Sequence, residues 1–112
     1  MKLSELEPAF VRYEGEKITR TEGVPLADAQ GIWFLCPLCF AKNKGNVGTH
    51  FVEVSFEERG VLPAQGSHGT DGKPTRWKMT GTDFADLTLT PSLKLEGGCA
   101  WHGFITKGAI TP

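Results

Sequence analysis

Apolar and polar residues alternate with a period of two in several short segments of the chain, a pattern that predicts half-buried β-strands. In the clearest segment, four leucines share one face: Leu87, Leu89, Leu93 and Leu95. Pro91 interrupts this segment, and because proline cannot donate to a strand ladder, it predicts an edge position or, in the preferred interpretation, a β-bulge. Residues 52–57 alternate in the same way.

Residues 31–35 are apolar at consecutive positions, which predicts a central strand covered on both faces. Shorter strands are expected at residues 10–13, 17–21, 77–80, 103–106 and 109–111. The first two form an N-terminal hairpin extension within residues 1–24, and the last two form a terminal hairpin. Residues 25–30, with proline at the start and glycine just beyond, suit one or two helical turns.

These elements predict an all-β protein with at most one short helix. At 112 residues the chain is expected to be one domain, residues 1–112, folded as a small β-sandwich or partly open barrel. Residues 59–75 are rich in glycine and proline and poor in apolar residues, so they predict a long loop. A loop of this length is either functional or mobile, and a plain solvated loop is the alternative.

The charge balance changes the picture little. Twelve basic and thirteen acidic side chains give a formal net charge of −1, which does not indicate a nucleic-acid-binding surface. The chain has no apolar stretch long enough to span a bilayer, and its start lacks the apolar core of a signal peptide. We therefore expect a cytoplasmic protein that does not bind membranes.

Candidate chemistry lies in two short motifs that use all three cysteines, Cys36-Pro37-Leu38-Cys39 and Cys99-Ala100-Trp101-His102. Three thiolates and one imidazole form a known structural zinc set. The motifs are separated by 59 residues (99 − 39 − 1), so one bound zinc ion would hold together sequence-distant parts of the fold. We therefore expect one zinc site per chain with Cys36, Cys39, Cys99 and His102 as ligands.

Other interpretations of the cysteines stay open. Iron can occupy a similar site, although a mixed Cys/His set favours zinc. Cys36 and Cys39 can also form a redox pair, or the cysteines can be buried and inert. The redox interpretation requires a helix that begins inside the motif, whereas the residues after Phe40 are rich in turn formers.

A resemblance to a known family is carried by residues 29–40, 66–69, 74–77, 87–93 and 98–105. These segments include the motifs Cys-Pro-x-Cys, Thr-x-x-Pro-Ser-Leu and Cys-x-x-His-x-x-Ile. Over residues 26–110 the chain resembles a group of small proteins from phages and prophages, some of them catalogued as ammonia monooxygenase. The resemblance implies a zinc-binding protein of this kind with the same four ligands, and it supplies no reaction.

The preferred functional hypothesis is a non-enzymatic protein-interaction module with structural zinc, whose partner is a phage or host protein. Four protein ligands leave no open position on the metal for a catalytic water. The oligomeric state does not follow from the sequence.

Two alternative functions are retained. The first is a small metal-dependent enzyme that uses His68 as acid or base and Arg76 to hold an anion, with His50 and Asp71 nearby. These four residues also form the candidate ligand or partner surface. The second is weak nucleic-acid binding through Lys42, Lys44 and Phe40 beside the cysteine motif.

Overall fold

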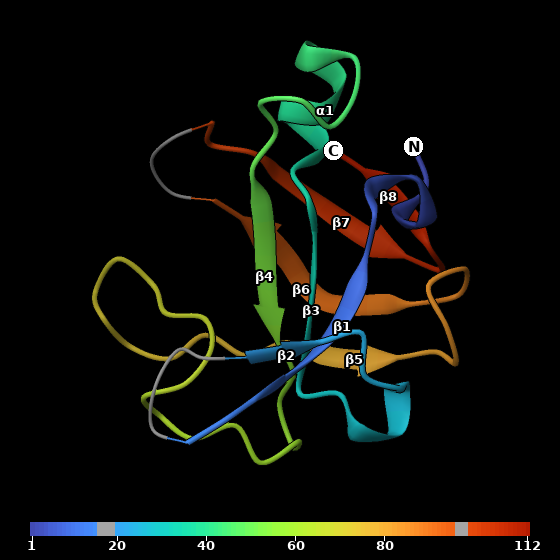
Figure 1. The fold of residues 1–112 in the computed structure, drawn as a ribbon. Coiled ribbons are helices and arrows are strands. Elements are labelled where there is room, and N and C mark those ends of the chain that lie inside the picture. Colours follow the sequence, from blue (N-terminus) through green and yellow to red (C-terminus); the bar gives the residue numbers. More distant parts are fainter. Residues whose placement is uncertain (16–19, 96–98) are drawn as a thin grey trace.

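The fold, given by a computed structural model that describes residues 1–15, 20–95 and 99–112, contains two antiparallel sheets of four strands each (Figure 1). The first has the order β2-β1-β3-β4, with β1 (Ala9–Tyr13), β2 (Arg20–Glu22), β3 (Gly31–Leu35) and β4 (Phe51–Ser55). The second has the order β5-β6-β7-β8, with β5 (Lys78–Thr80), β6 (Thr88–Lys94), β7 (His102–Thr106) and β8 (Ala109–Thr111). The predicted all-β class is confirmed.

Strand β3 lies inside the first sheet, paired with β1 on one side and β4 on the other. Its apolar run explains this position, because Ile32 and Phe34 are fully buried. At its start, a Cβ atom on Gly31 would lie 2.7 Å from the carbonyl oxygen of Val54, so only glycine allows this approach of β3 to β4. The sequence prediction of this strand was correct.

Strand β6 contains the predicted bulge. Leu89 pairs with Ile105 and Leu93 pairs with Gly103, so three residues of β6, from 90 to 92, lie opposite Phe104 alone. Because the proline in this segment has no backbone N–H, an irregular ladder costs less here than elsewhere in a strand. Ser92 is thereby displaced from regular pairing at the middle of the second sheet.

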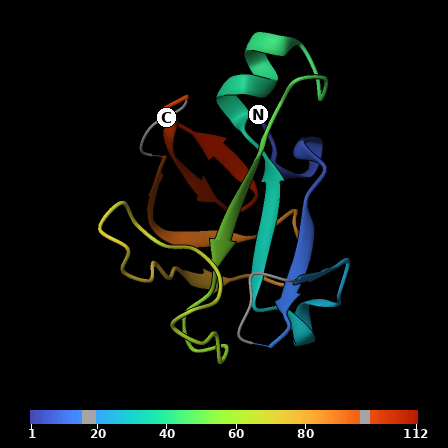
Figure 2. The same cartoon turned by 60° about the vertical axis from the view of Figure 1, so that its left-hand side comes forward.

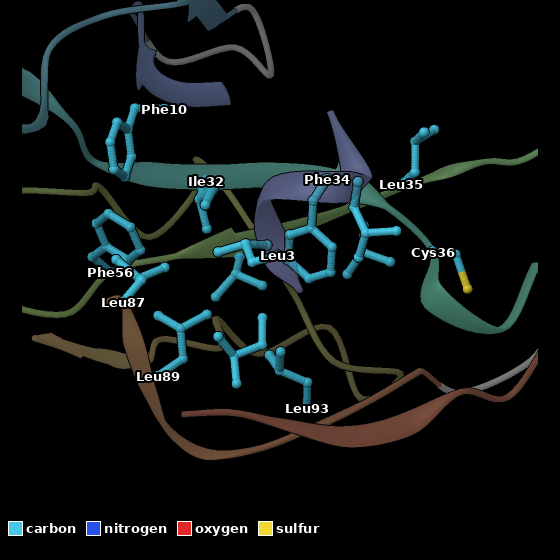
Figure 3. Packing of buried hydrophobic residues seen from close by; sticks show 14 of the residues in the cluster. Leu3, Phe10, Ile32, Phe34, Leu35, Cys36, Phe56, Leu87, Leu89 and Leu93 are labelled. Atoms are coloured by element: carbon cyan, nitrogen blue, oxygen red, sulfur yellow. The ribbon is translucent and has the colours of Figure 1, made fainter. Parts of the chain in front are cut away.

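The core lies between the two sheets. Its largest fully buried side chains come from both sheets and from the N-terminal segment: Leu3, Leu6, Ile32, Phe34, Phe56, Leu87, Leu93 and Ile105. Figure 3 shows side chains of β3 facing those of β6, with Cys36 at one end of the same row. The leucines of the 3₁₀ helix η1 (Leu3–Leu6) enter this cluster, and Figure 2 shows the two sheets from another side.

The helical segments differ in part from expectation. The turn expected at residues 25–30 is present as the 3₁₀ helix η2 (Leu26–Asp28). A seven-residue helix, α1 (Pro37–Asn43), begins inside the first cysteine motif, where only turns were expected. Proline is favourable in the first helical turn, and Lys44 ends the helix in the left-handed conformation. The turn formers that follow Phe40 therefore mark the end of a helix.

Candidate functional site

A cluster of four possible metal ligands lies beyond the end of the β3–β4 pair. The ligand atoms of Cys36, Cys39, His50 and Cys99 all lie within 4.8 Å of one another. The Cys36 and Cys99 sulfurs are 3.3 Å apart, and Nε2 of His50 is 3.2 Å from the Cys99 sulfur. Burial decreases from Cys36, which is fully buried, to His50, which is exposed.

The antiparallel register of β3 and β4 explains why His50 belongs to this cluster. Leu35 pairs with Phe51 at the end of the ladder, and the next step is a hydrogen bond of 2.8 Å from the Cys36 amide to the His50 carbonyl. The two residues therefore lie opposite each other. Helix α1 then returns Cys39 to the same place, since the Phe40 amide donates to the Cys36 carbonyl over 2.8 Å.

The structure does not bring His102, the expected fourth ligand, into the cluster, and His50 lies there instead. Side chains alternate along β7: Gly103 and Ile105 face the core, while His102 and Phe104 are exposed on the outer face. His102 is the Cα partner of Lys94 on β6. The three-residue step from Cys99 to His102 therefore ends on the other side of the sheet.

Two thiols of the cluster, Cys36 and Cys99, differ in pKa. Burial raises the pKa of Cys36 to about 12, against hydrogen bonds from the Cys39 and Leu38 amides that favour its thiolate. For Cys99, desolvation opposes ionisation, but the Trp101 amide and the hydrogen bonds from its neighbours outweigh it and lower the pKa to about 7. Cys99 is thus the thiol that ionises most readily of the two.

The donor set fits a metal ion. All three cysteines are free thiols, and the described residues contain no disulfide that would compete for them. Three sulfurs and one imidazole nitrogen match the composition of tetrahedral structural sites, and the separation of the donor atoms is small enough for all four to bind one ion. Cys36 and Cys99 are 63 residues apart in sequence, so one ion bound to both would link distant parts of the chain.

A second pair of polar side chains lies on the outer face of the second sheet. Nε2 of His102 is 3.2 Å from Oγ of Ser92, within hydrogen-bond reach. The bulge of β6 brings Ser92 to this position, and its carbonyl oxygen accepts a hydrogen bond of 3.3 Å from the Trp77 indole. Ser92 is partly exposed and His102 is exposed, so both are open to solvent.

Beside Ser92 lies a cavity of about 310 Å³, which we call the Ser92 cavity. Its walls include Glu53, Ser67, Trp77, Ser92 and Lys94. It therefore lies between β4, the long loop and β6. A volume of this size is at the lower end of the range for ligand-binding pockets.

The remaining serines and histidines are arranged differently. Ser67 donates its hydroxyl to the Glu53 carbonyl over 3.0 Å, and its amide donates to Oγ of Ser55. The His68 ring nitrogens lie 3.0 and 2.7 Å from the carbonyl oxygens of Gly66 and Pro63. Among the hydrogen bonds of the described residues, that of Ser92 is the one that joins a serine hydroxyl to an imidazole.

Arg76 and Asp71, predicted as a possible ligand or partner surface, both make contacts within the loop. The Arg76 guanidinium donates to four carbonyl oxygens, those of Leu62, Gln65, Ser67 and Thr75, at 2.8–3.0 Å. Oδ1 of Asp71 accepts a hydrogen bond of 3.0 Å from the Lys73 amide. The same loop is closed by a bridge between His68 and Pro74. Arg76 therefore holds residues 59–75 in shape.

Comparison with known proteins places the chain in a family. The sequence model of a family described as bacterial ubiquitination-like system serine protease (BubE) matches residues 10–112. The chain belongs to the BubE family. Neither a phage origin nor the ammonia monooxygenase label forms part of the BubE description. No curated protein matches the chain. No solved structure matches it either.

The sequence analysis placed His50 on a possible ligand or partner surface, and not with the cysteines, and it did not identify Ser92 as a residue of interest. His50 follows Cys39 after ten residues (50 − 39 − 1) and directly precedes β4, a spacing that a hairpin between β3 and β4 would have brought back to Cys36. Ser92 follows the proline that predicted the bulge. The helices in the described part of the chain are too short or too polar to span a lipid bilayer.

Proposed function

We propose that this chain is a serine protease in which Ser92 is the nucleophile and His102 is its general base. The observation that carries the proposal is the distance of 3.2 Å between Ser92 Oγ and His102 Nε2 on an exposed sheet face beside a cavity. A serine hydroxyl is a weak nucleophile unless an adjacent base accepts its proton. The description of the BubE family as serine proteases supports the same conclusion.

In the first half of the reaction, Ser92 Oγ attacks the carbonyl carbon of the scissile peptide bond while His102 Nε2 accepts the hydroxyl proton. The tetrahedral intermediate then collapses, and the carbon–nitrogen bond breaks. His102 gives its proton to the departing amine, so the products are a free amino terminus and an ester on Ser92.

In the second half, a water molecule attacks the ester carbonyl and gives a proton to His102. The carbon–oxygen bond to Ser92 breaks, and the proton returns to Ser92 Oγ. The acyl group leaves as a carboxylic acid, and the pair is restored. Since His102 is exposed and Ser92 is partly exposed, a polypeptide can reach both atoms from solvent.

We propose zinc as the ion of the cluster, with Cys36, Cys39, His50 and Cys99 as its ligands. Three sulfurs and one nitrogen favour zinc over magnesium or calcium, which prefer oxygen. A zinc ion with four protein ligands supplies a structural cross-link. No step of the reaction above requires it.

The substrate that we propose is a polypeptide of a bacterial ubiquitination-like system, because this is the system that the family description names. This proposal retains a protein partner, as the sequence hypothesis did, but gives it the role of a substrate. We also propose a location in the bacterial cytoplasm, because such a partner would be met there.

The test uses a biotinylated fluorophosphonate, which forms a covalent bond with serines activated by a neighbouring base, followed by peptide mapping. We expect one adduct at Ser92, no adduct after Ser92→Ala or His102→Ala, and an unchanged adduct after Ser4→Ala, since Ser4 is exposed and lies on η1. An adduct at Ser67, or none in the wild-type protein, would contradict the proposal and restore the non-enzymatic interaction module.

A further inference from the structure

A second and larger cavity adjoins His102 on the side of helix α1. It has a volume of about 500 Å³, and its walls include Leu38, Ala41, Trp101, His102 and Ile110. We call it the His102 cavity. Leu38 and Ala41 lie on α1, whereas the other three belong to β7, β8 and the segment before β7.

The two cavities adjoin different members of the Ser92–His102 pair. Ser92 lines the smaller cavity and His102 lines the larger one, and the described linings share no residue. Since the two side chains are joined by a hydrogen bond, the pair bridges the two cavities. A peptide with its scissile carbonyl at Ser92 Oγ would therefore have one cavity on each side of that bond.

The reaction mechanism determines which cavity lies on the leaving-group side of the scissile bond. The hydroxyl of Ser92 attacks the acyl carbon, whereas His102 must reach the nitrogen of the departing amine to protonate it. The nitrogen, and the residue that carries it, therefore lies nearer to His102 than to Ser92. The His102 cavity is on the leaving-group side of the scissile bond.

The linings of the two cavities also differ in charge. The Ser92 cavity has Glu53 and Lys94 in its walls. The described lining of the His102 cavity contains no Asp, Glu, Lys or Arg, and it exposes large apolar side chains such as Leu38, which is 38% exposed. Met1, with its amino group, and Pro112 also line the cavity. No side-chain carboxylate, ammonium or guanidinium group of the described lining would offset the desolvation of a charged side chain, so the surface favours an apolar one.

We infer that the His102 cavity is a specificity subsite that binds an apolar side chain of the substrate immediately after the scissile bond. This inference rests on the proposed function, since it requires cleavage at Ser92. Its volume lies within the range of pockets that bind small ligands, so a leucine or phenylalanine side chain fits inside it.

The inference is tested with a set of quenched fluorescent peptides that differ only in the residue after the cleaved bond: Leu, Phe, Gly or Glu. For the wild-type protein we expect kcat/KM to be about 10-fold or more higher for Leu and Phe than for Gly and Glu, a typical ratio for an apolar pocket. Cleavage positions are read by mass spectrometry.

Three substitutions locate this preference. Ala41→Trp fills the cavity, so we expect kcat/KM for the Leu and Phe peptides to fall about 10-fold, while the Gly peptide changes little. Lys42→Trp adds the same ring one residue away, outside the described lining, and should retain the wild-type preference. Leu38→Lys should raise kcat/KM for the Glu peptide relative to Leu, a gain that a folding defect cannot produce.

The outcomes separate this inference from the proposed function. If cleavage is lost with Ser92→Ala but the wild-type protein shows no preference after the scissile bond, the subsite is wrong and the protease remains. The subsite is also wrong if Ala41→Trp behaves like Lys42→Trp. If the wild-type protein cleaves none of the peptides and carries no fluorophosphonate adduct, both the proposed function and the subsite are wrong.

Discussion

Two histidines of this chain, His50 and His102, have contrasting environments. His50 lies at the end of the β3–β4 ladder, with its Nε2 atom 3.2 Å from the Cys99 sulfur in a cluster of metal ligands. His102 is only three residues from Cys99 in sequence, yet its Nε2 atom lies 3.2 Å from the Ser92 hydroxyl on an outer sheet face. The residue distant in sequence joins the cysteines, and the neighbouring one does not.

The difference follows from strand geometry. Residues directly across an antiparallel ladder come together whatever their sequence separation, as Cys36 and His50 do. Successive residues along one strand alternate between faces, and Trp101 is buried while His102 is exposed. A Cys-x-x-His spacing by itself therefore does not establish a shared metal site, and here the histidine already begins β7.

The largest effect is expected from substitutions in the Ser92–His102 pair, measured as peptide cleavage. Ser92→Ala and His102→Ala should each lower kcat/KM for peptide cleavage by roughly 10³-fold or more, because each removes one half of the nucleophile–base pair. Melting temperature and metal content should stay at wild-type values, since both side chains lie at the surface. Ser4→Ala is the control and should retain full activity.

Substitutions in the metal cluster should instead change metal content and stability. We expect Cys99→Ser and His50→Ala to lose bound metal and to lower the free energy of unfolding by on the order of 4 kcal/mol or more, because each removes a ligand that joins distant segments. Metal analysis and thermal melts measure both effects. If His50→Ala retained one metal ion per chain, its place in the cluster would be refuted.

A smaller effect is expected for the loop that borders the Ser92 cavity. Arg76→Ala should destabilise the protein by about 2 kcal/mol, since one guanidinium satisfies four loop carbonyls. It should also make residues 59–75 more sensitive to limited proteolysis. Arg76→Lys tests geometry against charge: an ammonium group cannot span the same four oxygens, so it should recover only part of the stability.

The smallest effect concerns Tyr13, whose hydroxyl lies 2.7 Å from Ser55 Oγ. Tyr13 belongs neither to the metal cluster nor to the Ser92–His102 pair. Burial raises the pKa of Tyr13 to about 12 from an ordinary value near 10. The folded state therefore holds this proton more tightly, so its stabilising contribution is complete below about pH 10 and is lost as pH rises toward 12.

Tyr13→Phe should remove this alkaline slope and cost about 1 kcal/mol at neutral pH. Chemical denaturation of both proteins between pH 8 and 11.5 measures the pH dependence of the free energy of unfolding. An equal loss of stability above pH 10 in wild type and variant would show that another group titrates. The variant should bind metal and cleave peptides normally.

The sequence predicted local features well and long-range partners less well. Strand β3, the bulge in β6 and the grouping of the three cysteines follow from apolar runs, one proline and paired spacing. These signals are local or chemically distinctive. Helix α1 was missed because its turn formers lie at its end, where they act as a cap.

The place of His50 in the cysteine cluster and the pairing of Ser92 with His102 were missed for a different reason. Each receives its partner from strand pairing, the first through the β3–β4 register and the second through the bulge between β6 and β7. A one-residue change in either register would turn the side chain away. The residue types do not specify the exact register of these strands. Ser92 and His102, ten residues apart, therefore look like ordinary polar positions in the sequence.

The division of roles between the two histidines is the central claim, and native mass spectrometry of His102→Ala after exposure to the fluorophosphonate tests it most directly. One spectrum records both the bound metal and the covalent adduct. We predict one metal ion per chain, with a mass consistent with zinc, and no adduct, whereas the wild-type protein carries both. Loss of the metal from His102→Ala, or an adduct that survives the substitution, would contradict the account.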